Sequence, residues 1–184
     1  MVTIVLVIHG FGSTAPNDNA QELFKQTEYC VVAPQLDHSD FESTKDKLES
    51  IVEAVLHAPG KLEDFIIVGS SFGGFWAHYL AKKYQVKTIL VNPALTIKDT
   101  CKRCRLNEEN TKKYLELSEK YEVNRYTPGI FVDILLGAKD DVIDPRYVME
   151  HFPAFEIMEN EGHSIVDKRK LINMIVTANN NLSQ

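Results

Sequence analysis

Six short runs of apolar residues recur along the chain, and longer segments of mixed polarity separate them. A run in which nearly every side chain is apolar forms a strand that must be covered on both faces, as in a buried parallel sheet. We therefore predict six buried strands, at residues 2–8, 29–33, 65–69, 86–91, 130–136 and 154–158.

Between these runs, apolar side chains return every three or four residues, which places them on one face of a helix. Residues 48–56 and 171–178 show this period, and Pro59-Gly60 is expected to end the first of these helices. A short helix is expected at 17–26. Strands that are covered on both faces need such helices on both sides of the sheet.

Residues 97–129 have a different character, because they are rich in charge and only weakly periodic. Their apolar cluster belongs to one expected helix and consists of Tyr114, Leu115, Leu117 and Tyr121. Two interpretations remain open. The segment is either a solvated helix that replaces an ordinary crossover or a small lid over a pocket.

Two further features of the sequence are given structural interpretations. Cys101-Lys102-Arg103-Cys104 is a lone C-x-x-C, whereas a zinc site needs about four ligands and a redox pair normally follows a strand directly. His38 and His57 flank the helix around residues 48–56, and we interpret both as surface or capping residues.

Composition and charge limit the classes of function. A chain of 184 residues with 44% hydrophobic content and no linker-like segment is expected to form one domain, residues 1–184, with a possible lid at 97–129. Its net charge of -6 and scattered Lys and Arg residues argue against a nucleic-acid binder. Small uncharged substrates fit this balance better than polyanions.

The cellular location is inferred from two features. The apolar opening, residues 1–8, lacks a basic flank and is too short for a signal peptide or a membrane span. Three cysteines are an odd number and, without a secretory signal, indicate a reducing cytoplasm. We expect a cytoplasmic protein with no membrane partner.

The most informative motif follows the third apolar run. Gly69-Ser70-Ser71-Phe72-Gly73 is a G-x-S-x-G, in which a sharp strand-to-helix turn exposes the central serine, Ser71, above the sheet. A phosphate-binding loop would need Lys and Ser/Thr where Phe75-Trp76 stand. Ser71 is the candidate nucleophile, and a structural glycine turn is the alternative.

The loop after the first strand also allows two interpretations. Residues 10–15, Gly-Phe-Gly-Ser-Thr-Ala, match a dinucleotide-binding fingerprint, but Pro16 and Asn17 delay the following helix. In the other interpretation the loop helps to form an oxyanion hole, where the backbone N–H groups of Phe11 and Phe72 hold the oxygen of a tetrahedral intermediate.

Two further residues complete a possible catalytic set. Asp140 and His163 each follow an expected strand, so the chain order is Ser71, Asp140, His163. This is the order of α/β-hydrolases, and it differs from that of chymotrypsin and subtilisin. The G-x-S-x-G turn, the loop after the first strand, an acid and a base all occur in the order and context of a serine hydrolase. Together they predict this function.

With these motifs the chain resembles the small bacterial α/β-hydrolase esterases of the YqiA/YcfP type. The resemblance rests on His9-Gly10-Phe11, Pro34-Gln35-Leu36, residues 68–74, Val91-Asn92-Pro93-Ala94, Gly137 with Asp140, and Gly162-His163. It is weakest in residues 97–129, so a substrate preference cannot be transferred.

The resemblance implies both a fold and an activity. The fold would be a three-layer α/β-hydrolase fold with a reduced six-stranded parallel sheet, in the order 2-1-3-4-5-6, and helices on both faces. The activity would be that of a carboxylesterase or thioesterase on short-chain acyl esters, with Ser71, Asp140 and His163 as its triad. Neither a cofactor nor a metal would be needed.

Two functions from other classes remain as alternatives. One is a non-catalytic binding protein built on a hydrolase scaffold, and the other is a dinucleotide-binding protein that uses residues 10–15. The expected partner is a small acyl ester or thioester, and the sequence does not indicate an oligomeric state.

Overall fold

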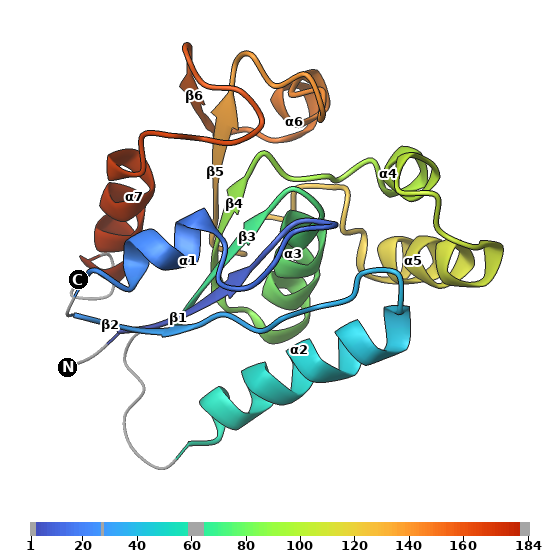
Figure 1. Ribbon diagram of the computed structural model, residues 1–184, viewed down its shortest axis with the longest axis horizontal. Coiled ribbons are helices and arrows are strands. Elements are labelled where there is room, and N and C mark those ends of the chain that lie inside the picture. The colour runs from blue at the N-terminus through green and yellow to red at the C-terminus, as the bar shows by residue number, and fades with distance from the viewer. Residues whose placement is uncertain (1–2, 27, 59–64, 181–184) are drawn as a thin grey trace.

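The computed structural model describes residues 3–26, 28–58 and 65–180, and its centre is a six-stranded parallel sheet (Figure 1). The strand order is β2-β1-β3-β4-β5-β6, as predicted. The strands are β1 (Thr3–Ile8), β2 (Tyr29–Val32), β3 (Phe65–Ser70), β4 (Lys87–Val91), β5 (Val132–Gly137) and β6 (Glu156–Met158). Their observed ends lie within two residues of the predicted ones, and residue 2 lies outside the described residues.

Helices cover both faces of this sheet, as Figure 1 shows. One face carries α1 (Asp18–Leu23) and α7 (Arg169–Asn180). The other face is covered by α2 (Phe41–Leu56), α3 (Phe72–Tyr84), α4 (Ile97–Arg103), α5 (Glu108–Tyr121) and α6 (Arg146–His151).

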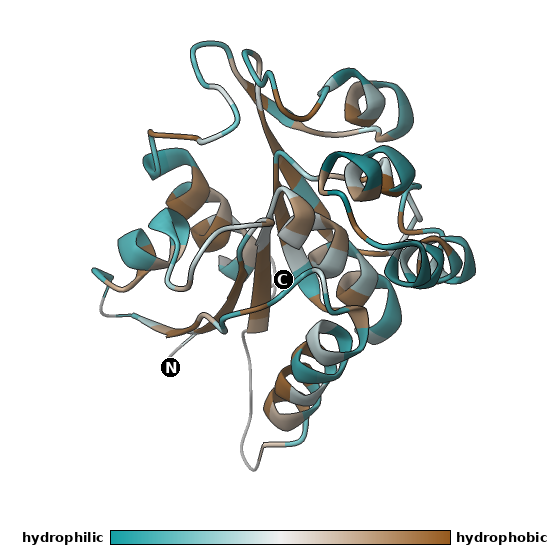
Figure 2. Cartoon of the chain, turned by 45° about the vertical axis from the view of Figure 1, so that its right-hand side comes forward, coloured by the Kyte–Doolittle hydropathy of each residue, from teal (hydrophilic) through white to brown (hydrophobic). Residues whose placement is uncertain are grey.

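The apolar runs form these strands because successive side chains enter two separate cores. In β1, Val5 and Val7 pack in the core under α1 and α7, whereas Leu6 and Ile8 pack in the core under α2 and α3. Figure 2 shows the result as hydrophobic strands between helices that turn their hydrophilic faces outward. Fully burying one such side chain contributes about 1.5–3 kcal/mol.

The helix predictions are correct in position and differ in length. The segment expected at 17–26 forms α1 over the shorter range Asp18–Leu23, with Asn17 as its N-cap. Helix α2 is capped by Asp40 and ends at Leu56, while Pro59-Gly60 lies outside the described residues.

Residues 97–129 contain two helices, α4 and α5, where the sequence predicted one. The Tyr114 ring of α5 is fully buried against Phe72, Phe75 and Trp76 of α3. The sequence did not predict α4, because this helix is short and its few apolar residues show no clear period.

The two cysteines of the C-x-x-C lie in α4 and at its C-terminal end. Cys101 of α4 is fully buried in the core, and Cys104 packs against it. Burial raises the pKa of the Cys101 thiol to about 12, so this thiol stays protonated at neutral pH and acts as a small apolar side chain.

Within the described ranges, no helix is both long and apolar enough to cross a membrane. The same part of the chain contains no group of three or more His, Cys, Asp or Glu side chains placed to hold a metal ion.

Candidate active site

The turn between β3 and α3 holds Ser71 in an unusual backbone conformation. Its φ is 53° and its ψ is -122°, a region that costs a residue with a side chain roughly 1–3 kcal/mol. The flanking glycines make the turn possible. A Cβ at Gly69 would overlap Ala77 and the backbone of Gly73, and a Cβ at Gly73 would overlap the carbonyl oxygens at the end of β1.

The Ser71 hydroxyl lies at one end of a chain of hydrogen bonds. It is 3.1 Å from His163 Nε2, and His163 Nδ1 is 2.9 Å from Asp140 Oδ2 and 3.1 Å from Oδ1. Because the carboxylate can only accept, Nδ1–H donates to Asp140 and Nε2 accepts from Ser71. The structure therefore brings together the three side chains that the sequence selected.

The Asp140 carboxyl is held in place by its own loop. Its side chain is 1% exposed, and its Oδ1 accepts hydrogen bonds of 2.8 Å from the N–H groups of Val142 and Ile143. Burial alone would raise the pKa of this carboxyl, but these bonds and the one from His163 hold the pKa below its ordinary value. Asp140 is therefore ionised at neutral pH, whereas its neighbour Asp141 is an exposed residue.

Asn92 connects the loops that carry the acid and the base. Its Oδ1 accepts from the Gly137 N–H at 2.7 Å, and its Nδ2 donates to the carbonyl oxygens of Gly162 and His163 at 3.0 and 2.8 Å. Asn92 is buried and has a positive φ of 45°. Sequence reasoning assigned it no role, although its position directly after β4 was a usable signal.

The loop after β1 lies directly over Ser71. A Cβ built on Gly10 would be 3.1 Å from the Ser71 Cβ, and the rings of Phe11 and Phe72 stack at 6.1 Å. Within the described residues, the backbone N–H groups of Phe11 and Phe72 have no hydrogen-bond acceptor. The loop does not lead directly into a helix, because α1 begins only at Asp18. This arrangement lacks the βαβ context of a dinucleotide site.

Two buried histidines hold this loop, and one of them corrects an expectation. His9 Nε2 accepts from the Leu36 N–H at 3.0 Å, so its Nδ1–H donates to the Gly10 carbonyl at 2.7 Å. His38, expected at the surface, is 2% exposed, and its Nε2–H donates to the His9 carbonyl at 2.9 Å. Burial lowers the pKa of His38 to about 4, so the ring is neutral. His57 caps α2, as expected.

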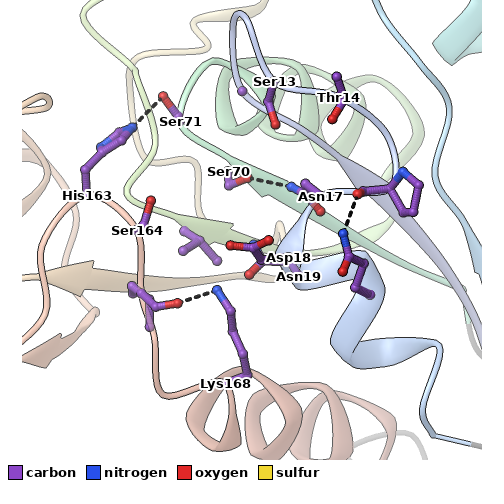
Figure 3. Close-up of a pocket in the computed structure, with 15 residues that line it drawn as sticks. Ser13, Thr14, Asn17, Asp18, Asn19, Ser70, Ser71, His163, Ser164 and Lys168 are labelled. Atoms are coloured by element: carbon purple, nitrogen blue, oxygen red, sulfur yellow. Dashed lines mark hydrogen bonds between the residues drawn. The ribbon is translucent and has the colours of Figure 1, made fainter.

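A cavity of about 270 Å³ opens beside Ser71 and His163 (Figure 3). Its walls come from the loop after β1, the start of α1, the end of β3 and the segment 163–168. Ser70 lies in this wall, where its Oγ is 3.4 Å from Asn17 Nδ2. No residue of 97–129 lines this cavity in the described structure. The sequence did not identify Ser70 or Asn17, because their hydroxyl and amide groups are also common in turns.

Comparison with known proteins places the chain in a family. The profile of UPF0227, described as an uncharacterised protein family, matches residues 4–179. A UPF0227 protein from Shewanella woodyi is 24% identical over 157 residues, which cover 83% of this chain and 84% of that protein.

Solved structures share the fold at low sequence identity. Est1E from Butyrivibrio proteoclasticus superposes with a TM-score of 0.70 and 12% identity, over 98% of this chain and 87% of that one. MGS-MChE2, an α/β-hydrolase enzyme from the metagenome of lagoon sediments at Mar Chica, Morocco, superposes with a TM-score of 0.66 and 15% identity. The match covers 96% of this chain and 90% of that one. The chain therefore has an α/β-hydrolase fold.

Proposed function

Because the chain belongs to the UPF0227 family and has an α/β-hydrolase fold, we propose that it is a serine hydrolase acting on carboxylic esters or thioesters. The observation that carries this proposal is the hydrogen-bonded chain from Ser71 through His163 to Asp140. A scaffold that only binds ligands has no physical need for a serine in a strained turn, paired with a histidine that a buried carboxylate orients.

The proposed mechanism assigns one task to each side chain. The Ser71 oxygen attacks the carbonyl carbon while His163 Nε2 takes the serine proton. Asp140 accepts from Nδ1–H, which keeps the histidine in the required tautomer and stabilises its charged form. The protonated Nε2 then donates to the leaving group, and a water molecule activated by the same nitrogen releases the acyl group.

The developing negative charge needs its own donors. We assign this task to the backbone N–H groups of Phe11 and Phe72, which lie on the loop over Ser71 and at the start of α3. Their free hydrogens support the assignment, since an oxyanion hole must not be occupied by protein acceptors. Loss of one such donor typically costs about 10²- to 10³-fold in kcat.

The test combines covalent labelling with turnover. A fluorophosphonate should label Ser71, and a panel of p-nitrophenyl esters of graded acyl length should be hydrolysed. Ser71→Ala should lose the label and nearly all turnover, since it has no nucleophile. Ser50→Ala, an exposed serine of α2, is the matched control.

The alternatives predict other outcomes. A folded protein that takes no label and cleaves no activated ester would support a non-catalytic binding protein on a hydrolase scaffold. A rise in melting temperature with NAD(P) would support the dinucleotide alternative. The cytoplasmic location stays a prediction from the three cysteines, all of which are free thiols.

A further inference from the structure

An ester has an acyl part and an alcohol part, and the cavity beside Ser71 is large enough for only a compact group. Its volume is about 270 Å³. This is below the range of roughly 300–1,000 Å³ that is usual for drug-sized ligands. A compact group therefore fills the cavity, and a long alkyl chain would extend out of it.

Most of the cavity wall is made of groups that both donate and accept hydrogen bonds. In Figure 3 the Asn17 amide points toward Ser70, and the Ser71 hydroxyl points toward His163. Usual small-molecule sites are mainly apolar with a few polar groups. This wall has the opposite balance, and an alkyl group in it would displace water from polar groups without replacing the hydrogen bonds.

Asn19 is the most informative residue in this wall. It lines the cavity and is 5% exposed, and its amide has no hydrogen-bond partner among the described residues. Both amide atoms reach the solvent of the cavity, so water satisfies them in the free protein. A ligand with both donors and acceptors would satisfy the oxygen and the nitrogen of this amide.

The charges in the wall indicate a ligand without net charge. Lys168 and Asp18 both line the cavity, and their opposite charges balance. The Lys168 ammonium donates to the Ile165 carbonyl, and burial lowers its pKa even though Asp18 attracts it. Asp18 attracts a cation and repels an anion, and Lys168 does the reverse, so the pair gives no net advantage to an ion of either sign, whereas hydroxyl groups can bond to both.

The position of His163 indicates which part of the ester enters the cavity. His163 and Ser164 line it together with Ser71. In the proposed mechanism Nε2 protonates the departing oxygen, which must therefore lie close to His163. The departing oxygen belongs to the alcohol part, so the alcohol lies on the His163 side of Ser71.

Building on the serine-hydrolase function above, we propose that this cavity binds the alcohol part of the ester and that the alcohol is a compact, uncharged polyol. Asn19 and Lys168 are the residues that recognise its hydroxyl groups.

The first experiment compares esters that share one acyl group. Xylitol 1-acetate and pentyl acetate have five-carbon alcohols that differ in hydroxyl groups, and O-acetylserine carries a zwitterion. Each kcat/KM is divided by the rate constant for hydroxide-catalysed hydrolysis of the same ester, which removes differences in intrinsic reactivity. We expect the xylitol ester to give the highest corrected value. A preference for pentyl acetate or O-acetylserine would overturn the proposal.

The second experiment tests the assigned residues. Asn19→Ala and Lys168→Met should each lower the ratio of xylitol acetate to pentyl acetate hydrolysis by roughly fivefold to tenfold, the effect of one lost hydrogen bond. Lys168 is only partly buried, so its variant should fold even if Asn19→Ala does not. Asn173→Ala, an exposed asparagine of α7, is the matched control. An unchanged ratio in both variants would overturn the proposal.

A binding measurement separates this proposal from the proposed function. In an NMR titration of the Ser71→Ala protein, free xylitol should shift the resonances of residues that line the cavity, and 1-pentanol should not. If xylitol binds but no ester is cleaved, the hydrolase proposal fails and the polyol site stands. If esters are cleaved but xylitol does not bind, the polyol site fails and the hydrolase proposal stands.

Discussion

At the scale of single residues, the site depends on backbone positions that only certain residues tolerate. Ser71 and Asn92 both have positive φ, at 53° and 45°, and they follow the ends of the neighbouring strands β3 and β4. Such conformations persist only where the surroundings enforce them. At Ser71 the enforcing contacts are those of Gly69 and Gly73, and at Asn92 they are three side-chain hydrogen bonds.

The role of Asp140 can be tested by a change of one atom. Asp140→Asn should keep the acceptor for Val142 and Ile143 but place an N–H₂ group against His163 Nδ1, which favours the wrong tautomer. We expect kcat to fall by up to roughly 10⁴-fold with little change in fold. Asp141→Asn, at the exposed neighbouring position, should change kcat only slightly. A large loss in Asp141→Asn with a mild effect in Asp140→Asn would contradict the assignment of the acid.

Asn92 should act as a positioning residue. Asn92→Gly tolerates the positive φ but removes all three bonds to the acid and base loops, so His163 is held less firmly. We expect kcat to fall by about 10²-fold and KM to change little, since a small displacement of a catalytic group has this effect. Gln85→Gly, also at positive φ but exposed at the end of α3, is the matched control. A change in KM alone would argue against this role.

At the residue scale, the sequence indicated which side chains lie together where a motif ties chemistry to chain order; their catalytic role stays a prediction. Ser71, Asp140 and His163 were selected because each follows a strand, and in the structure they are hydrogen-bonded. The burial of His38 was not predictable, because the partner that draws it inward, the His9 carbonyl, lies 29 residues away. Asn19 was missed because which asparagine faces the cavity depends on how distant segments of the chain approach each other.

At the scale of elements, the strands were predictable because their period is simple and both of their faces are buried. The final helix was placed from its apolar period over residues 171–178, and α7 runs from Arg169 to Asn180. The insert was harder to predict, because α5 is polar on most of its surface and buries mainly Tyr114 and Leu117. A helix that contributes so few side chains to the core leaves a weak pattern.

The function of the insert is a prediction at this scale. Helix α5 packs on α3, and the Tyr114 hydroxyl donates to the His38 carbonyl at 2.9 Å, so the packing favours a structural crossover over a lid. We expect Tyr114→Phe to lower the free energy of unfolding by about 1–3 kcal/mol, the cost of a buried carbonyl without its donor. The Tyr114→Phe variant should keep the acyl-length preference of the wild type.

Leu115 provides the complementary test, because it lies on the exposed side of α5. For a crossover, Leu115→Asn should leave the acyl-length preference on the p-nitrophenyl ester panel unchanged. If the segment is a lid, this variant should shift the preference while the labelling of Ser71 stays intact. A shifted preference would therefore contradict the crossover and support the lid.

At the scale of the whole molecule, the strand order places every candidate side chain at the same edge of the sheet. Parallel strands end together, so the loops after β1, β3, β4, β5 and β6 meet at their carboxyl ends. This convergence was expected from the resemblance to known hydrolases, and the observed order confirms it. The shape and polarity of the cavity could not be expected, because they depend on how α1 and the segment 163–168 approach each other.

The stability of the molecule should depend on pH through two buried histidines. Burial lowers the pKa of His38 to about 4 and that of His78 to about 3, whereas both would titrate near 6.5 in the unfolded chain. Between pH 6.5 and 4 the unfolded state therefore binds more protons than the folded state. The free energy of unfolding is then highest above pH 6.5 and falls as the pH decreases through this window.

The slope of this dependence is the measurable quantity. Each histidine should contribute about 1.4 kcal/mol per pH unit between pH 6 and 5, where most carboxylates remain ionised. His78 Nδ1–H donates to the Val123 carbonyl, and His78→Asn can keep that donor without titrating. Urea unfolding of the variant at several pH values should give a slope smaller than the wild-type slope by about 1.4 kcal/mol per pH unit, whatever its absolute stability. Equal slopes would show that His78 is not held neutral by burial.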